Sequence, residues 1–263
     1  MVADSGISGM DVMMMLHGIG TAVPDRYFRQ EECWEALSRS DRVRSLQPGS
    51  RRLLERVLCR ENGIEGRYLA VEPLEVLFVE DADGLNERFR TRAPALAGRA
   101  LREALARAEV GVGDVDALFV CTCTGYLCPG VSSYVAEEVG LGAGTYLNDL
   151  VGLGCGAAIP MLRAAAGFLA AEPEATVACV AVELSSAAFY LDDDAGVLIS
   201  ACLFGDGACA TVWKGERKRG GMGWRCGGFQ TVHRPEYRDL LRFEMREGKL
   251  RNRLHRSVPE RVA

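Results

Sequence analysis

The sequence has few of the side chains and patterns that mark metal sites or nucleic-acid surfaces. It contains only three histidines, His17, His233 and His255, and no Cys-x-x-C pair, so the usual spacing of zinc ligands is missing. The net charge is −5 at pH 7, and the one dense basic segment, residues 214–219, is short. We therefore expect neither a metal site nor a nucleic-acid partner.

Signals for export or membrane insertion are also lacking. Residues 1–18 are acidic and hold only a short apolar run, which is not typical of a signal peptide. The longest apolar stretch, residues 150–171, is interrupted by Pro160 and Arg163, which favours a buried helix over a membrane span. The ten cysteines lie mostly in apolar segments, as reduced, buried thiols do. These features predict a cytoplasmic protein without a membrane span.

What the sequence does contain is enough apolar side chains to build a core. Of its 263 residues, 48% are hydrophobic and 25% are charged. Patterns typical of helices and strands alternate, and the strands have almost no polar positions, which predicts an α/β fold with a covered, mainly parallel sheet. Strands are expected at 13–23, 117–122, 145–147, 176–182 and 208–213, and helices at 30–38, 51–60, 93–109, 132–139 and 155–170.

A connection rich in Gly, Lys and Arg runs from residue 214 to 223 and marks the best boundary in the chain. We predict a first domain over residues 1–214. Residues 215–263 would then hold this connection and the first strands of a second domain, at 227–232, 240–245 and 250–254, with a turn at 246–249.

A cysteine between two glycines, Gly154-Cys155-Gly156, stands just ahead of a predicted helix. Glycines permit a tight turn and leave room for a ligand, and the start of a helix favours a thiolate. Such a cysteine can attack a thioester. The local pattern leaves a second interpretation open, in which Cys155 is a small buried residue that packs a glycine-rich turn.

Four segments occur together around this cysteine. They are Cys-Thr-Gly-Tyr-Leu-Cys-Pro-Gly at 123–130, the Gly-Cys-Gly turn, Val-Glu at 182–183 and Leu-Phe-Gly-Asp-Gly-Ala at 203–208. In order and spacing they resemble the type III polyketide synthases, which are chalcone/stilbene synthase-like enzymes of the thiolase superfamily, and in particular the bacterial ones. The resemblance runs from about residue 12 to the end of the chain. It implies a thiolase-like fold with a complete N-terminal α/β half and a second half that is only begun.

The resemblance also implies roles for individual residues. Cys155 matches the nucleophile that carries the acyl chain, and Phe204 matches an aromatic gate between a coenzyme A tunnel and the cavity. Candidate coenzyme A contacts are Arg60 and Arg67. The positions that match cavity-lining residues are Cys123, Thr124, Cys128, Ser185 and Ala188, with Cys128 reaching into the partner subunit. Acyl-CoA and malonyl-CoA are then the substrates, no separate cofactor is needed, and the protein is a homodimer or is completed by a partner polypeptide.

The groups that stabilise the enolate during decarboxylative condensation are missing. The family supplies them from a histidine and an asparagine in its C-terminal part, and none of His17, His233 and His255 stands in the family's His-Pro-Gly-Gly-like context. We therefore expect an acyltransferase that loads Cys155 but does not condense by itself. Two alternatives are a non-catalytic binding or dimerisation partner of a full-length synthase, and a condensing enzyme like β-ketoacyl-carrier-protein synthase III.

Overall fold

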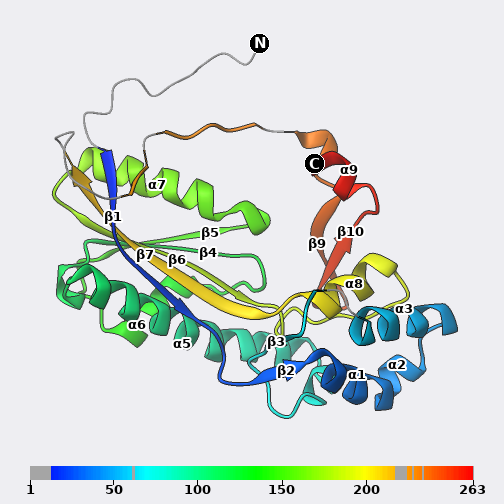
Figure 1. Ribbon diagram of the computed structural model, residues 1–263. Helices are drawn as coiled ribbons and strands as arrows, with labels where there is room; N and C mark the ends of the chain where they lie inside the picture. The colour runs from blue at the N-terminus through cyan, green and yellow to red at the C-terminus, as the bar shows by residue number, and fades with distance from the viewer. Residues whose placement is uncertain (1–12, 61–62, 217–223, 227, 233, 263) are drawn as a thin grey trace. The chain divides into compact units, whose positions relative to one another are not determined.

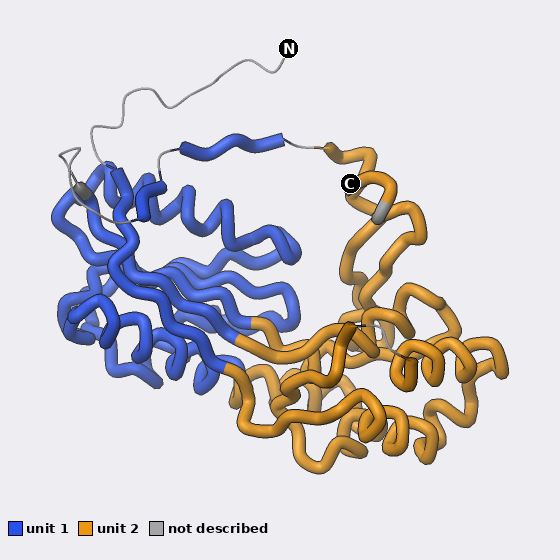
Figure 2. The backbone as a smooth tube through the Cα atoms, in the orientation of Figure 1, with its two compact units in different colours: residues 1–22, 93–182, 208–233 blue, residues 23–92, 183–207, 234–263 orange. Residues whose placement is uncertain are grey.

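The computed structural model describes residues 13–60, 63–216, 224–226, 228–232 and 234–262. Two compact units, each built from three segments of the chain, make up the structure (Figure 2). Unit 1 is drawn from Met1–Ala22, Ala93–Val182 and Ala208–His233, and unit 2 from Val23–Arg92, Glu183–Gly207 and Arg234–Ala263. This discontinuous division differs from the predicted boundary after residue 214, because strands distant in sequence pair within one sheet.

Unit 1 is a six-stranded sheet with helices on both faces (Figure 1). Its strands lie in the order β5-β4-β6-β7-β1-β8. β4 pairs in parallel with β5 and β6, whereas β1 pairs antiparallel with β7 and β8, so the sheet is mixed. The strands are β1 Met13–Ala22, β4 Ala117–Thr122, β5 Tyr146–Val151, β6 Thr176–Leu184, β7 Asp206–Glu216 and β8 Arg225–Cys226.

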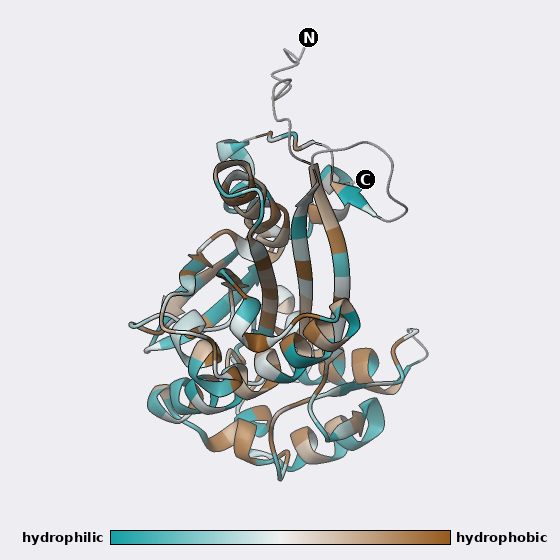
Figure 3. Cartoon of the chain, turned by 90° about the vertical axis from the view of Figure 1, so that its left-hand side faces the viewer, coloured by the Kyte–Doolittle hydropathy of each residue, from teal (hydrophilic) through white to brown (hydrophobic). Residues whose placement is uncertain are grey.

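The central strands are buried on both faces, as predicted. All six residues of β4 are buried, and hydrophobic residues are concentrated along the strands of the sheet (Figure 3). Alternate residues such as Phe119 and Cys179 face α7, which lies on one side, while α5 and α6 lie on the other. The helical segments of this unit are α6 Val131–Val139, α7 Ala158–Ala171, the second part of α5 Ala82–Ala108, and the short 3-10 turns η1 Val112–Asp114 and η2 Gly154–Gly156.

The helix α7 is buried on one face only. Met161, Ala165 and Leu169 pack on the sheet, but only 28% of the segment Gly154–Ala171 is buried, although its length and apolar composition would allow it to cross a membrane. The sequence predicted a buried helix here. The remaining face of α7 is largely apolar but also carries Arg163, whose guanidinium donates to the Thr231 hydroxyl at 2.8 Å.

Strand β1 changes face at a bulge. Its register with β7 shifts between Leu16 and Gly18, so Met14 and Leu16 belong to the core under α7, whereas Gly18 and Gly20 face α5. The two glycines allow the strand to touch the helix backbone. A Cβ on Gly20 would stand 2.1 Å from the carbonyl oxygen of Ala100.

Unit 2 is mainly helical. Leu37, Leu54, Leu58 and Leu198 from α1, α3 and α8 form its core. Two short antiparallel pairs complete it, β2 with β3 and β9 with β10. Its elements are α1 Gln30–Arg39, α2 Asp41–Arg44, α3 Pro48–Cys59, α4 Val76–Val79, the first part of α5, α8 Ala195–Leu203, η3 Pro235–Tyr237, α9 Val258–Val262, β2 Tyr27–Arg29, β3 Gly66–Tyr68, β9 Leu241–Arg246 and β10 Lys249–Leu254.

The β9–β10 hairpin is attached to the rest of unit 2 by a buried arginine. Arg251 donates to Asp192 at 2.7 Å and to Glu244 at 2.8 Å, and these carboxylates raise the pKa of the guanidinium. The predicted turn at 246–249 joins the two strands, and Gly248 has a positive φ of 73° there. The strand predicted at 227–232 is wrong, because the described residues 228–232 have no regular structure and β8 lies just before them.

Replacing Gly20 by alanine should destabilise unit 1. The new methyl group would collide with backbone atoms of α5, which cannot rotate away, so we expect a loss of about 1–3 kcal/mol in the free energy of unfolding. Urea denaturation followed by circular dichroism measures this change. Gly167→Ala on α7 is the matched control: its Cβ meets nothing within 4 Å, and helix propensity predicts a gain of up to about 1 kcal/mol. Equal effects of the two substitutions would contradict the close approach of β1 to α5.

Candidate active site

Cys155 lies in a sharp turn between β5 and α7. Gly152 and Gly154 have positive φ angles of 82° and 70°, a backbone conformation that side chains with a Cβ rarely adopt. Cys155 follows in the 3-10 turn Gly154–Gly156, and α7 starts at Ala158. The Cys155 residue is exposed. The turn therefore presents this thiol at the surface of unit 1, next to the N-terminal end of a fourteen-residue helix.

Most of the other cysteines are less suited to react. All ten lie in the described part of the chain, and none of them forms a disulfide. Burial raises the pKa of the Cys202 thiol to about 12 and raises the pKa of Cys179 still further, so both stay protonated and inert. Cys59 and Cys209 are exposed, but partial burial also raises the pKa of each thiol. Exposure alone thus does not single out Cys155, but its turn geometry does.

The loop at 123–130 starts at the same end of the sheet as the Cys155 turn. β4 and β5 are parallel neighbours, and Thr122 at the end of β4 is paired with Val151 at the end of β5. The chain segments that follow the two strands therefore leave the sheet side by side. In the first of them Cys123 is half-buried, Thr124 is buried and Cys128 is exposed. The structure brings these three predicted residues to the edge that carries Cys155.

An aspartate that the sequence analysis missed fixes the end of this loop. Asp149 on β5 accepts a hydrogen bond from the backbone N–H of Ser132, at 3.0 Å, and a second from the Ser132 hydroxyl. Gly130 lies directly against the carboxylate, since a Cβ there would stand 2.1 Å from its Oδ2 atom. Asp149 therefore holds the start of α6, and with it the end of the 123–130 loop, against the strand that leads to Cys155.

Phe204, Ser185 and Ala188 belong to unit 2. Phe204 follows the last residue of α8, and 42% of its surface is exposed. The Ser185 hydroxyl donates to the carbonyl of Gly205 at 2.9 Å, and Ala188 is half-buried in the turn that follows β6. Ser185 and Phe204 are therefore connected through the backbone of the Phe204-Gly205 turn.

The two predicted coenzyme A contacts have different environments. Arg67 is only 8% exposed, and its Nη1 donates to the carbonyls of Ala201 and Phe204, the second at 3.1 Å. This burial disagrees with a role for Arg67 in binding phosphate. Arg60 is exposed and follows α3 directly.

Arg60 continues a stripe of arginines along α3. Arg52, Arg56 and Arg60 are spaced four residues apart and therefore share one side of the helix. None of the three forms an ion pair with another described residue. A groove of about 610 Å³ runs along this side, lined by Gly49, Arg52, Leu53, Glu55, Arg56, Cys59 and Arg60. Three guanidinium groups thus line one groove together with a single carboxylate, that of Glu55, and such a cluster of arginines favours a phosphate-bearing molecule.

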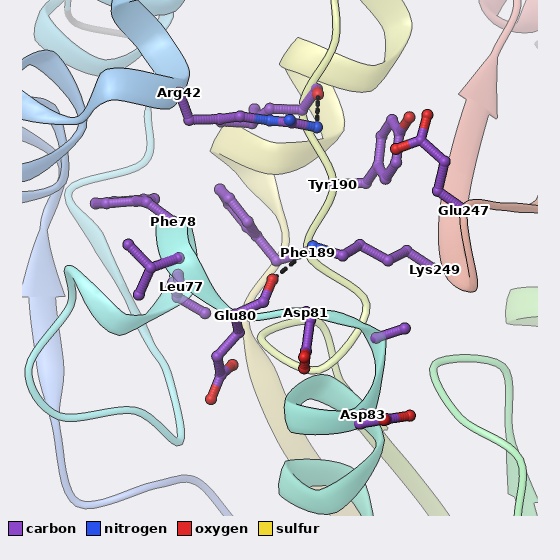
Figure 4. A pocket seen from close by; sticks show the side chains of 13 residues that line it. Arg42, Leu77, Phe78, Glu80, Asp81, Asp83, Phe189, Tyr190, Glu247 and Lys249 are labelled. Carbon is purple, nitrogen blue, oxygen red and sulfur yellow. Dashed lines mark hydrogen bonds between the residues drawn. The ribbon is translucent and has the colours of Figure 1, made fainter.

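A second concavity in unit 2 contains none of the predicted site residues. Its volume is about 460 Å³, and its walls combine aromatic and charged side chains (Figure 4). The Arg42 guanidinium lies 6.0 Å from the ring centroid of Tyr190, and Lys249 donates to the carbonyl of Glu80. The lining residues are Arg42, Leu77, Phe78, Val79, Glu80, Asp81, Ala82, Asp83, Phe189, Tyr190, Leu191, Glu247 and Lys249.

The described histidines do not form a catalytic group. His17 is an exposed residue of β1, and the Nδ1 atom of His255 lies 2.7 Å from the Ser257 hydroxyl. His233 lies outside the described residues. No group of three or more His, Cys, Asp or Glu side chains within the described ranges could hold a metal ion.

Comparison with known proteins agrees with this arrangement of motifs. Residues 23–221 match the family described as FAE1/Type III polyketide synthase-like protein. The chain is 29% identical over 207 residues to a 1,3,6,8-tetrahydroxynaphthalene synthase of Streptomyces peucetius subsp. caesius, covering 78% of this chain and 54% of that enzyme. It is 32% identical over 199 residues to a 3,5-dihydroxyphenylacetyl-CoA synthase of Streptomyces toyocaensis, covering 74% of this chain and 48% of that enzyme.

Similarity in three dimensions extends over most of the chain. The crystal structure of 1,3,6,8-tetrahydroxynaphthalene synthase from Streptomyces coelicolor A3(2), a bacterial type III polyketide synthase, matches with a TM-score of 0.79 and 27% identity. The match covers 94% of this chain and 69% of that structure. This structural match confirms the predicted thiolase-like α/β fold. The chain spans about half the length of the curated relatives named above. The chain belongs to the type III polyketide synthase-like family.

Proposed function

We propose that this chain is the cysteine-bearing part of a type III polyketide synthase and that Cys155 accepts an acyl group from an acyl-CoA. The observation that carries the proposal is the exposed position of Cys155 in the glycine turn before α7. In this step the Cys155 thiolate attacks the thioester carbonyl, a new carbon–sulfur bond forms, and the coenzyme A thiolate leaves and takes up a proton. The reaction needs no metal or separate cofactor, and its soluble substrates fit a cytoplasmic enzyme.

Condensation requires more than this thiol. When malonyl-CoA loses carbon dioxide, the resulting enolate must be stabilised by hydrogen-bond donors. The described histidines His17 and His255 lie on β1 and after β10, and neither stands in the family's His-Pro-Gly-Gly-like context. We propose that the chain alone loads the acyl group and that condensation depends on the part of the family's length that this chain does not span.

Incubation with acetyl-CoA, hexanoyl-CoA or malonyl-CoA should leave one acyl group on the protein. Intact-mass spectrometry should show the corresponding increase in wild type and none in Cys155→Ala. Cys209→Ala is the matched control, since it removes another exposed thiol and should keep the adduct. A mass increase that persists in Cys155→Ala, or no increase with any of the three thioesters, would show that Cys155 is not the nucleophile. Loading from an acyl carrier protein but not from coenzyme A would favour a β-ketoacyl-carrier-protein synthase III-like enzyme.

The groove on α3 is the proposed contact for the phosphates of coenzyme A. Arg52 and Arg56 join Arg60 there, and the buried Arg67 is not part of it. Converging guanidinium groups bind phosphates through charge-assisted hydrogen bonds, and here they outnumber the one carboxylate on the groove, that of Glu55. The reactive thioester lies at the far end of the pantetheine arm, so this groove would determine affinity rather than chemistry.

Arg52→Gln/Arg56→Gln should raise the KM for hexanoyl-CoA in the loading of Cys155 by roughly thirtyfold, because each of the two lost charge-assisted contacts contributes about 1 kcal/mol. Hexanoyl-pantetheine, which lacks the nucleotide phosphates, should acylate Cys155 at the same rate in the double variant as in wild type. Arg51→Gln on the same helix is the matched control, because Arg51 does not line this groove. If both substrates slow down equally in the double variant, the groove is not the phosphate site.

The exposed edge of the sheet is the proposed interface with a second copy of the chain. β5 ends the sheet, and its free edge has no strand partner among the described residues. Tyr146, Leu147 and Val151 on this strand are 47%, 37% and 42% exposed, and Leu153 in the following turn is 51% exposed. An apolar, unpaired edge strand readily pairs with another chain. The same surface would serve the alternative function, that of a non-catalytic dimerisation partner. Acylation of Cys155 distinguishes the two, because only an acyltransferase takes up an acyl group.

Leu147→Lys should convert a dimer into a monomer, because a lysine on an edge strand opposes pairing. Sedimentation velocity at several protein concentrations measures the change. Val232→Lys is the control, since Val232 is 67% exposed but lies outside the sheet. A Leu147→Lys protein that remains dimeric, or a wild-type protein that is monomeric throughout, would contradict an interface at β5.

A further inference from the structure

The concavity drawn in Figure 4 is formed by four segments of unit 2. α2 contributes Arg42, the stretch from α4 to the start of α5 contributes residues 77–83, the segment between β6 and α8 contributes residues 189–191, and the β9–β10 hairpin contributes Glu247 and Lys249. Its volume of about 460 Å³ is that of a small-molecule site. None of these residues takes part in the proposed acylation step, so the concavity is a candidate for a further site.

Two cations extend into this pocket from opposite sides (Figure 4). Arg42 donates to the carbonyl of Leu191 at 3.1 Å, and its guanidinium lies 6.0 Å from the ring centroid of Tyr190. Lys249 donates to the carbonyl of Glu80 at 2.5 Å. These bonds hold the side chains without neutralising them, and neither cation forms an ion pair within the described part of the chain. Both charges therefore remain available to an anionic group.

Carboxylates of the same pocket also lack a cation partner. Glu80 is not one of them, because it pairs with the buried Arg88. Asp83 and Glu247, in contrast, form neither an ion pair nor a side-chain hydrogen bond with another described residue. Charges of both signs thus line one pocket without neutralising each other.

The hairpin turn gives Glu247 an unusual backbone conformation. Glu247 and Gly248 are the two residues between the paired Arg246 and Lys249, and their φ angles are 53° and 73°. Such turns favour asparagine or aspartate ahead of the glycine, because most other side chains are strained at positive φ. Strained residues are found mainly at functional positions such as ligand sites. Here the strained residue brings its carboxylate to the Tyr190 side of the pocket (Figure 4).

The hairpin is held in place by contacts outside the pocket. Arg251 in β10 donates to Asp192 at 2.7 Å, and Gly248 lies against α5, since a Cβ there would stand 2.9 Å from the Cβ of Ala82. The two charged hairpin residues of the pocket are thus positioned independently of their own charges. Walls that are fixed in advance reduce the entropy lost when a ligand binds.

An apolar wall completes the pocket. The rings of Phe78 and Phe189 lie 5.8 Å apart at an angle of 57°, and both pack on the core that contains Leu77 and Leu191. The apolar body of a ligand can cover these rings while its charged groups stay near the rim.

We propose that this pocket binds a small zwitterion with an aromatic or aliphatic body, of the class of an apolar α-amino acid. The carboxylate of the ligand binds Arg42 and Lys249, and its ammonium group binds Glu247. Its side chain covers the rings of Phe78 and Phe189. A simple anion or cation would leave one set of charges desolvated and unmatched, whereas a zwitterion matches both. The proposal does not rest on the proposed function, because all of these residues belong to unit 2.

Isothermal titration calorimetry with L-phenylalanine tests the site. The probes 3-phenylpropanoate and phenethylamine have the same ring but lack the ammonium group and the carboxylate, respectively. L-phenylalanine should bind roughly tenfold more tightly than either probe, because each probe leaves one set of charges unmatched. Equally tight binding of either probe would overturn the proposal. So would the absence of binding of L-phenylalanine, L-tyrosine and L-leucine at concentrations up to about 20 mM.

Two substitutions should affect the probes in opposite ways. Glu247→Gln should weaken L-phenylalanine roughly tenfold and leave 3-phenylpropanoate unchanged, because it removes only the partner of the ammonium group. Lys249→Met should weaken L-phenylalanine and 3-phenylpropanoate and leave phenethylamine unchanged. Arg44→Gln is the matched control, since Arg44 lies on α2 with Arg42 but does not line the pocket. Equal weakening of all three ligands by Glu247→Gln would overturn the assignment of charges.

Further measurements separate binding from folding and from acylation. Hydrogen exchange of the amides at 241–254 shows whether Lys249→Met loosens the hairpin, and if it does, Arg42→Gln takes its place. Cys155→Ala should bind L-phenylalanine as tightly as wild type does, whether or not Cys155 accepts an acyl group. Loss of binding in Cys155→Ala would overturn the assignment of the site to unit 2.

Discussion

The turn at Gly152 and Gly154 is the constraint on which the proposed active site depends. Both residues have left-handed backbone angles, and together they reverse the chain from β5 into α7 within a few residues. A residue with a Cβ at either position would strain this turn and move Cys155. The parallel register of β4 and β5 adds the second requirement, because it delivers the loop at 123–130 to the same edge of the sheet. The glycine turn and the parallel pairing of β4 with β5 together bring Cys155 to the same edge of the sheet as Cys123, Thr124 and Cys128.

Elements with a strong apolar pattern could be predicted from the sequence. β4 was predicted at its observed bounds, since all six of its residues are buried and its ends are marked by polar residues. The start of α5 was placed eleven residues late, because the polar segment before Ala93 has no clear apolar stripe. α8 was not predicted at all. Its nine residues are uniformly apolar or small, so the sequence carries no helical period there.

The polar contacts could not be predicted, because each joins residues that lie far apart in the sequence. The resemblance suggested Arg67 as a candidate coenzyme A contact, yet it is buried against carbonyls more than a hundred positions away. Asp149 gave no signal beyond an acidic residue near a glycine. A charged side chain is usually exposed, so sequence reasoning assigns it to the surface unless its partners are known. The glycines were more informative, since Gly154 and Gly130 marked the places where backbone or side-chain atoms approach closely.

The apolar nature of α8 explains why unit 2 buries so many polar groups at one place. The helix begins with Asp194, whose side chain accepts from Gly196 and Val197, but no polar side chain of its own is available at its other end. Its last carbonyls would remain unsatisfied in the core unless other segments supplied donors, and a buried unpaired carbonyl costs about 1–3 kcal/mol. Arg67 and Gln30 meet this need by donating to the carbonyls of Ala201 and Cys202, and because they are buried, their own positions are fixed by the core around them. Arg67 also binds the carbonyl of Phe204, the residue that follows the helix, so the same buried guanidinium satisfies the chain just beyond the helix end.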